Sequence, residues 1–404
     1  MKMIEGGVTA AKGFSAGGMY CGIRKNKTKP DLAMIYSSAP CAAAGMYTSN
    51  LVKGAPILVT KRNLANGVAR AVICNSGNAN TCNADGEEKA WRMCEIAGQA
   101  LNIDPSDVIV ASTGVIGQVL PIEPIEETAP LLASSLKGDG SELAAKAIMT
   151  TDTVVKEAAA EFTVGGKTVR LGGICKGSGM IHPNMCTMLC FLTTDAAIAA
   201  PVLDKALRGV VAETFNMVSI DGDTSTNDTI TVMANGLAEN PEILADTPEY
   251  EEFTQALRAI CTDLARKMAK DGEGATKLLV CKVTGAANLT DARTVAKSVI
   301  CSSLLKAAMF GADANWGRVL CAMGYSKAPF RPEYVDVKFI SAVGEVLVCK
   351  DGMGLNFDEE SAKSILTQDE VTIDVCLHEG EWEASCWGCD LTYDYVKING
   401  DYRT

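Results

Sequence analysis

The stretch from Lys176 to Phe191, KGSGMIHPNMCTMLCF, contains the residues whose types and spacing could do chemistry. Thr187 follows the small residue Cys186 at the end of a loop punctuated by Gly, Pro and Asn, and an apolar run begins directly after it. A threonine hydroxyl is a weak nucleophile without a base beside it, and an N-terminal threonine can use its own α-amine as that base. Because Thr187 lies within the chain, this chemistry requires the Cys186–Thr187 peptide bond to break first. The alternative is a loop leading into a buried strand that contains a threonine, and this stretch alone favours the alternative.

Further segments along the chain share one resemblance. They are AIMTTDT (147–153), VASTGVIG (110–117), DGEGATK (271–277), FGADANWGR (310–318) and the terminal WGCDLTYDYVKINGDYRT. Together with KGSGMIHPNMCTML, they resemble the ornithine acetyltransferase family of arginine biosynthesis, also called glutamate N-acetyltransferases. The resemblance runs from GVTAAKGF near the start to the last residue. It therefore covers essentially the whole chain and favours the nucleophile interpretation of Thr187.

The resemblance implies a role for each matching residue. Thr187 matches the nucleophile, and cleavage is expected between Cys186 and Thr187, although the family most often has Ala or Gly before the nucleophile. Thr113 and Gly114 match the family's oxyanion hole, and a turn with glycine at a strand end suits that role because it exposes backbone donors. The positions that match substrate contacts are Thr150, Lys176, Thr187, Glu273, Asn399 and Thr404.

The chemistry of the substrate-contact residues suits an amino-acid ligand. Lys176 can pair with a carboxylate, Glu273 can pair with an ammonium group, and Asn399 and Thr404 can complete the hydrogen bonds. Each residue taken alone would more simply be a solvated surface residue. Thr150 is the hardest to assign, because other threonines follow it closely in the sequence.

The resemblance also implies a reaction without a cofactor. After self-cleavage into chains of residues 1–186 and 187–404, Thr187 would take the acetyl group of N2-acetylornithine and pass it to glutamate in a ping-pong transfer. Acetyl-CoA as a second acetyl donor, and with it a multifunctional enzyme, stays open. The two chains are expected to associate further, as a heterotetramer.

Two other functions are compatible with parts of the same sequence. An N-terminal-threonine aminopeptidase or amidase would use the same nucleophile and release its product to water. A non-enzymatic metabolite-binding protein would bind ornithine or glutamate and remain a single uncleaved chain.

Composition and charge exclude several classes of protein. The chain has 404 residues, 48% of them hydrophobic and 21% charged, which is typical of a folded chain with a large core. The formal net charge of −12 argues against a nucleic-acid partner. No run approaches the roughly 18 apolar residues of a membrane span, and the start, MKMIEGGVTAAKGF, lacks an apolar signal-peptide region. These features predict a cytoplasmic enzyme.

Cysteines, histidines and one glycine-rich turn could suggest other sites. The 16 cysteines lack the spacing of a disulfide framework, so free thiols are favoured. A zinc site usually needs two close pairs of ligands, and the only close pair besides CWGC (386–389) lies at the expected cleavage point. No metal is therefore expected. GGKT (165–168) lacks the first glycine of a phosphate-binding loop and instead predicts a hairpin turn. His182 is interpreted as a loop-packing residue rather than a base, and His378 as a strand-end residue.

Periodicity predicts a mixed α and β chain. One helix is expected at 248–270, with Thr247 as its cap, and another at about 87–101. A strand at 108–111, which ends at Thr113-Gly114, is expected to follow the second helix. Residues 333–349 predict a hairpin that turns at 342–344. By resemblance, the fold class is α+β, a layered sandwich of two sheets flanked by helices with a smaller C-terminal α/β portion. The expected domains are residues 1–280 and 281–404.

Overall fold

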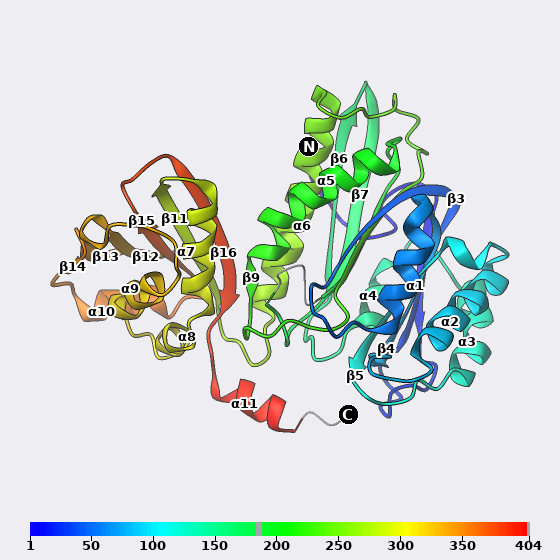
Figure 1. The fold of residues 1–404 in the computed structure, drawn as a ribbon, viewed down its shortest axis with the longest axis horizontal. Coiled ribbons are helices and arrows are strands. Elements are labelled where there is room, and N and C mark those ends of the chain that lie inside the picture. Colours follow the sequence, from blue (N-terminus) through cyan, green and yellow to red (C-terminus); the bar gives the residue numbers. More distant parts are fainter. Residues whose placement is uncertain (183–187, 402–404) are drawn as a thin grey trace.

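The computed structural model describes residues 1–182 and 188–401 (Figure 1). Within this part of the chain it contains a nine-stranded and a seven-stranded sheet with helices packed against them, which confirms the predicted α+β class. The larger sheet contains β1 (Lys2–Ile4), β2 (Phe14–Met19), β3 (Leu32–Tyr47), β4 (Val68–Asn78), β5 (Val108–Val115), β6 (Lys156–Val164), β7 (Lys167–Lys176), β8 (Leu189–Thr194) and β10 (Thr229–Ala234). The smaller sheet contains β9 (Val218–Ser219), β11 (Leu278–Ala286), β12 (Asp336–Ser341), β13 (Gly344–Lys350), β14 (Met353–Gly354), β15 (Glu370–Cys376) and β16 (Trp382–Cys389). The α-helices are α1 (Ala55–Asn63), α2 (Gly86–Leu101), α3 (Glu123–Ser134), α4 (Ser141–Ile148), α5 (Ala200–Glu213), α6 (Pro248–Lys270), α7 (Leu289–Cys301), α8 (Ser303–Phe310), α9 (Trp316–Gly324), α10 (Glu359–Leu366) and α11 (Tyr393–Gly400).

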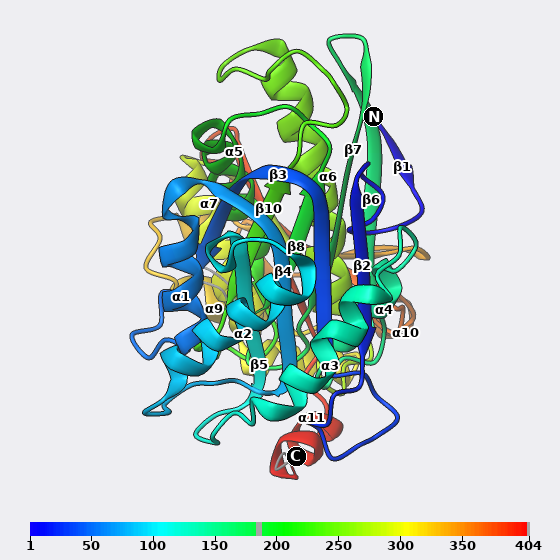
Figure 2. The same ribbon diagram turned by 90° about the vertical axis from the view of Figure 1, so that its right-hand side faces the viewer.

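The larger sheet folds over so that its two halves face each other. Strand β3 makes this possible because its first half pairs with β2 and β4, its end pairs with β10, and its register shifts between Tyr36 and Cys41. Alternate residues of each strand then point to opposite faces. In β8, Leu189 and Phe191 enter the core between the two halves, while the residues between and after them enter the core under α5 and α6. Figure 2 shows β4 and β5 in front of β7, β8 and β10.

Helices cover the outer faces of this sandwich. The outward residues of β3, β4 and β5 share a core with α1, α2 and α3, and the outward residues of β6, β7, β8 and β10 share one with α5 and α6. This arrangement matches the predicted layers of helices outside two packed sheets. It also places the end of β5 in one half near the end of β7 and the starts of β8 and β10 in the other.

Helix α6 begins and ends where the sequence predicts. The Thr247 hydroxyl accepts the backbone N–H of Tyr250, and Pro248 occupies the first turn, where its missing N–H costs nothing. Its buried face, which includes Phe253 and Leu257, packs against β6 and β7 and also contacts β11 and β16 of the smaller sheet. Figure 1 shows α6 between the two sheets. The helix then delivers the chain directly into the segment 271–277.

Other local predictions are confirmed with small shifts of boundary. Helix α2 spans Gly86–Leu101, β6 and β7 turn at Gly165-Gly166, and β12 and β13 form the C-terminal hairpin. The predicted strand at 108–111, expected to end at Thr113-Gly114, is too short, because β5 continues to Val115 by pairing with β4.

The smaller sheet receives strands from both sides of residue 280. Strand β9 precedes it by some sixty positions in the sequence and pairs with β16, while β11 begins at Leu278. The division into domains of residues 1–280 and 281–404 stays a prediction.

Candidate active site

Six of the nine predicted site residues surround one cavity of about 130 Å³. The other three, Cys186, Thr187 and Thr404, lie outside the described residues. Met188 and Leu189, which follow Thr187 directly, also line the cavity. The six predicted residues that line it are Thr113, Gly114, Thr150, Lys176, Glu273 and Asn399. They come from five parts of the chain, which are separated by about twenty-five to more than a hundred residues.

Thr113 and Gly114 lie in β5 where its pairing with β4 becomes irregular. Gly114 has φ +134°, and a Cβ at this position would lie 2.3 Å from the carbonyl carbon of Gly77, so only glycine fits here. The register shifts between Gly77 and Asn78. Such irregularities re-aim the groups of a strand near its end, which suits a residue pair that must present donors to a cavity.

Lys176 is the last residue of β7 and is 7% exposed. Its Nζ donates to the Thr113 hydroxyl over 3.3 Å. Lys176, predicted to bind a substrate carboxylate, therefore contacts Thr113, predicted to belong to the oxyanion hole. Burial lowers the pKa of Lys176, and the nearby charge of Asp152 partly opposes this shift. The hydrogen bond to Thr113 therefore holds the buried amine beside the cavity.

Glu273 and Asn399, which also line the cavity, are hydrogen-bonded to each other. Glu273 is 8% exposed, and its backbone N–H donates to the Ser178 carbonyl over 2.8 Å. The Asn399 side chain donates to Oε2 of Glu273 over 2.7 Å. Asn399 belongs to α11, which begins at the Thr392 cap and, in Figure 1, carries the C-terminal end of the chain beneath the two sheets. The cavity is thus lined by both an amine and a carboxylate, which suits a ligand with charges of both signs.

Asp228 also lines the cavity and was missed from the sequence. It lies just before β10, is 1% exposed, and its Oδ2 has no hydrogen-bond partner among the described residues. Burial raises the pKa of Asp228 well above its ordinary value, although the hydroxyls of Thr48 and Ser225 oppose the shift. In the sequence, Asp228 stands between a polar segment and a strand. This pattern is common where strands begin, so it did not single out Asp228.

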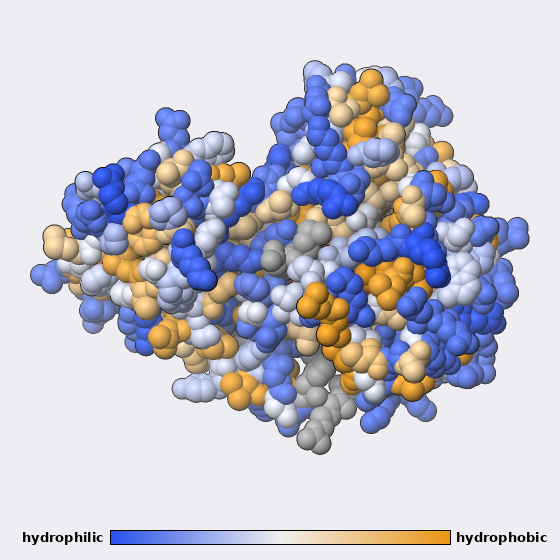
Figure 3. All heavy atoms as spheres, viewed as in Figure 1, coloured by the Kyte–Doolittle hydropathy of each residue, from blue (hydrophilic) through white to orange (hydrophobic). Residues whose placement is uncertain are grey.

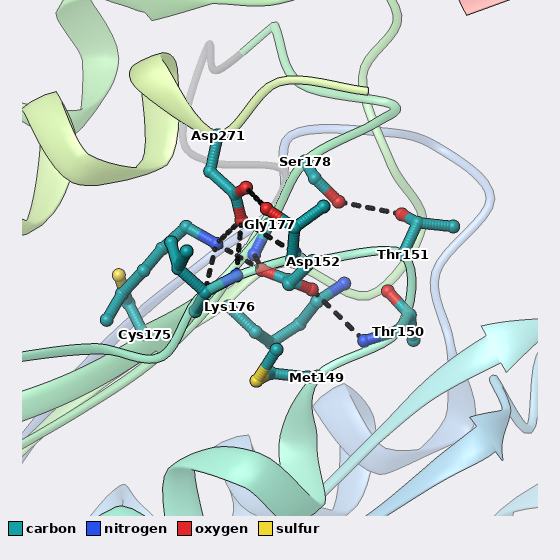
Figure 4. A network of polar contacts seen from close by, with 12 residues as sticks. Met149, Thr150, Thr151, Asp152, Cys175, Lys176, Gly177, Ser178 and Asp271 are labelled. Carbon is teal, nitrogen blue, oxygen red and sulfur yellow. Dashed lines mark hydrogen bonds and ion pairs between the residues drawn. The ribbon is translucent and has the colours of Figure 1, made fainter. Parts of the chain in front are cut away.

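A buried ion cluster joins the segments that carry the site residues. The Nζ of Lys156 lies 2.6 Å from Oδ1 of Asp152 and 2.5 Å from Oδ2 of Asp271, and the three side chains are at most 7% exposed. Figure 4 shows the two carboxylates on either side of the segment that carries Lys176 and Gly177. Burial alone would raise the pKa of Asp152, but the ammonium groups of Lys156 and Lys176 bring it down to about 2.

Each carboxylate of this cluster also holds backbone. Asp152 accepts the N–H of Thr150 over 3.0 Å and that of Gly177 over 2.7 Å. Asp271, two residues before Glu273, accepts the N–H of Thr153 over 3.0 Å. The cluster therefore fixes the loops that carry three of the residues around the cavity. Sequence reasoning missed it because its partners are far apart in the chain.

The remaining sequence interpretations fall outside this cavity. His182 hydrogen-bonds through Nδ1 to the Ser219 hydroxyl at 3.0 Å, and burial lowers its pKa to about 4, so it packs in its loop as predicted. His378 lies two residues beyond β15, with Nε2 3.0 Å from Oδ2 of Asp336. Cys386 and Cys389 are buried thiols in β16. Residues 1–182 and 188–401 contain no group of three or more His, Cys, Asp or Glu side chains that could hold a metal ion.

Comparison with known proteins decides the family. The model of the ArgJ family matches residues 15–404. This chain belongs to the ArgJ family. It is 51% identical to the arginine biosynthesis bifunctional protein ArgJ of Symbiobacterium thermophilum, with 100% of both chains covered. It is 49% identical to ArgJ 1 of Clostridium acetobutylicum, over 98% of this chain and 97% of that one.

A solved ArgJ structure is similar over a shorter length. The crystal structure of the arginine biosynthesis bifunctional protein ArgJ from Bacillus halodurans is 47% identical with a TM-score of 0.50. The match covers 52% of this chain and 97% of that one, so that chain is about half as long as this one. This ArgJ-family chain is an acyltransferase of arginine biosynthesis.

Figure 3 shows hydrophilic residues over most of the visible face, with smaller hydrophobic groups among them. None of the helices in the described part of the chain combines the length and apolar character needed to cross a bilayer.

Proposed function

We propose that this ArgJ-family chain moves an acetyl group from N2-acetylornithine to glutamate through an acetylated Thr187. The observation that carries the proposal is the cavity beside the start of β8, which is lined by both Lys176 and Glu273. Both substrates carry a carboxylate and an ammonium group, since N2-acetylornithine keeps the ammonium group of its side chain. Opposite charges on the protein complement such ligands and fix their orientation.

The proposal requires the chain to be cut between Cys186 and Thr187. The Thr187 hydroxyl attacks the Cys186 carbonyl carbon, the acyl group shifts from nitrogen to oxygen, and water hydrolyses the resulting ester. The half-length chain of the B. halodurans relative supports this step, because its chain is matched almost completely by about half of this one. Cleavage gives Thr187 an α-amine with an ordinary pKa of about 7.7–8.0, which suits a base at neutral pH.

Transfer then takes place in two halves without a cofactor. The Thr187 hydroxyl loses its proton to its α-amine and bonds to the acetyl carbon, and ornithine leaves with the proton. Thr113 and the Gly114 N–H stabilise the negative charge on the carbonyl oxygen in each half. The Lys176 amine, 3.3 Å from the Thr113 hydroxyl, adds positive charge to that wall. The α-amine of glutamate finally attacks the acetyl ester and frees Thr187.

Intact-mass spectrometry and a transfer assay test the proposal together. Wild-type protein is expected as two fragments, residues 1–186 and 187–404, that co-purify without a covalent link. Thr187→Ala should stay as one full-length chain and transfer no acetyl group. Wild-type protein that remains uncut while it transfers acetyl groups from acetylornithine to glutamate would refute the N-terminal-threonine mechanism.

The same assay separates transferase from hydrolase. An N-terminal-threonine amidase would release acetate from acetylornithine at the same rate with and without glutamate. The proposed transferase should form acetylglutamate in equal amount to ornithine, with little acetate. Release of acetate alone would favour the amidase.

A further inference from the structure

Of the described residues that line the active-site cavity, three are ionisable: Lys176, Glu273 and Asp228. Lys176 donates to the Thr113 hydroxyl, and Glu273 accepts the side-chain N–H of Asn399. In the proposed reaction both are charged contacts for the substrates. Asp228 has no role in that reaction, although it borders the same space and is 1% exposed.

The backbone holds Asp228 beside the start of β8. Its carbonyl accepts the N–H of Thr48 over 3.1 Å, and the N–H of the next residue, Thr229, donates to the Met188 carbonyl over 2.9 Å. Met188 follows Thr187 directly in the chain. The carboxyl group of Asp228 is therefore carried by fixed backbone at the point where β8 begins.

The Asp228 carboxyl group holds a proton more readily than an ordinary aspartate. Burial raises its pKa well above the ordinary value, against the opposing effects of the Thr48 and Ser225 hydroxyls, the Lys176 charge and the Met188 N–H. Its Oδ2 has no hydrogen-bond partner among the described residues. Burial disfavours the anion of such a group, so the neutral acid is the resting form. A neutral acid beside a reacting centre can donate its proton and accept one back.

The proposed acetyl exchange moves one proton that the Thr187 hydroxyl does not supply. In the first half, the hydroxyl proton reaches the leaving nitrogen through the α-amine of Thr187, which gives ornithine with a neutral α-amine. Free amino acids carry an ammonium group at neutral pH, so ornithine takes up a second proton. In the second half, glutamate arrives as an ammonium ion and loses one proton before its nitrogen attacks the acetyl ester. One further group that donates a proton in the first half and accepts one in the second would therefore balance the exchange.

We propose that Asp228 is this group, a catalytic acid and base that donates its proton to the leaving ornithine and accepts one from the incoming glutamate. The O–H bond of the carboxyl group breaks as an N–H bond of ornithine forms, and the second half reverses this step with a proton of glutamate. Between the two halves Asp228 is a carboxylate, and Lys176 is the cation that lines the same cavity. The inference rests on the proposed acetyl exchange and adds the residue that carries its second proton.

Asp228→Asn tests the inference, because the amide keeps the shape of a neutral carboxyl group but cannot exchange a proton. General acid–base groups typically contribute about 10²–10⁴-fold, so kcat for acetyl exchange should fall by about 10²-fold or more. Cleavage at Cys186–Thr187 should continue, because the shift from nitrogen to oxygen needs only the hydroxyl proton. Asp228→Glu, which keeps an acid in the cavity, should recover part of kcat. If Asp228 only filled space as a neutral side chain, Asp228→Asn would exchange acetyl groups at the wild-type rate.

Chemical rescue separates proton transfer from a structural role. Asp228→Ala removes the carboxyl group, and added formate, the smallest carboxylic acid, should restore part of the lost rate. Thr113→Ala is the matched control, because it also lowers kcat but lacks a donor to the oxyanion, which formate does not replace. An equal response of the two variants to formate would overturn the inference.

The pH dependence of kcat/KM for acetylornithine gives a third readout. Asp228 must hold its proton in the free enzyme, so the wild-type value should fall at high pH as that proton is lost. Lys176 and Glu273, the other ionisable residues among the described lining of the cavity, are unchanged in Asp228→Asn. The part of the fall due to Asp228 should therefore be absent from that variant. A wild-type value that does not fall at high pH would overturn the inference even if Asp228→Asn did not fold.

The remaining outcomes separate this inference from the proposed function. Wild-type exchange rates in Asp228→Asn would overturn the inference and leave the proposed function standing. Loss of cleavage in a folded Asp228→Asn would also overturn it, because the carboxyl group would then act before acetyl exchange begins. Wild-type enzyme that moves no acetyl group from acetylornithine to glutamate would instead refute the proposed function.

Discussion

Replacing Lys156 with Met should destabilise the fold strongly. The Lys156 Nζ is the only cation within 4.0 Å of Asp152 and Asp271 in the described part of the chain, at 2.6 and 2.5 Å. Methionine fills similar volume but leaves two buried carboxylates without this partner. Backbone N–H groups still contact them, yet the charge is no longer balanced locally.

The expected cost follows from the burial of the cluster. Breaking a buried ion pair by removing one partner typically costs about 3–5 kcal/mol, because the remaining charge stays desolvated. The side chains of Lys156 and Asp152 are 0% exposed, so this range applies without a discount for solvent. The matched control is Lys146→Met, because Lys146 pairs with Glu142 at a similar distance, 2.7 Å, but the two side chains are 47% and 60% exposed. Exposed pairs of this kind contribute about 0.3–0.5 kcal/mol.

Urea unfolding followed by circular dichroism measures both variants against wild type. The loss in Lys156→Met should exceed that in Lys146→Met several-fold. It should also shrink at acid pH, because protonation of the carboxylates removes the unbalanced charge. Adding Asp271→Asn to Lys156→Met should restore part of the loss. Equal losses of stability in the buried and the exposed variant would refute the argument from desolvation. If Lys156→Met is insoluble, the milder variant Asp271→Asn is compared with Lys146→Met instead.

Three further predictions concern the site itself. Thr113→Ala should lower kcat for acetyl transfer by about 10²–10³-fold with little change in KM, as loss of one oxyanion donor typically does; a change in KM alone would mean that Thr113 contacts substrate instead. Glu273→Gln keeps the shape of the side chain and should lower acetyl transfer while cleavage at Cys186–Thr187, followed by mass spectrometry, survives; equal loss of both would show a structural role. The pKa of Asp152 is about 2 against an ordinary 3.8, so its contribution to stability is present above pH 3.8 and is lost as the pH falls to about 2. Asp152→Asn should therefore make the free energy of unfolding depend less steeply on pH between about 2 and 3.8. An unchanged dependence would contradict a lowered pKa of Asp152.

Local patterns in the sequence predicted the elements that hold the site. Helix α6 could be placed because Thr247, Pro248 and an apolar face of period 3.6 all act within a few residues. The same is true of the hairpin at Gly165-Gly166, where two glycines at positive φ make the turn. The end of β5 was misplaced because strand length depends on the pairing partner, and β4 lies some forty residues earlier.

That these residues belong to one site was predicted from the family resemblance and not from any local sequence pattern. Asn399 and Glu273 are 126 residues apart, and nothing in either segment indicates that their side chains meet. The ion cluster was missed for the same reason, since Lys156 and Asp271 are 115 residues apart.

The position of the buried charges says more about the site than about stability. An ion cluster in a core is often no better for stability than apolar side chains of the same volume, because desolvation offsets the attraction between the charges. This cluster, however, also accepts the backbone N–H groups of Thr150 and of Gly177, the residue after Lys176. Apolar side chains would fill the space but could not hold those N–H groups, and each unsatisfied buried group costs about 1–3 kcal/mol. The charges therefore serve to set two loops at fixed positions beside the cavity, which is where small displacements cost an acyl-transfer enzyme most of its rate.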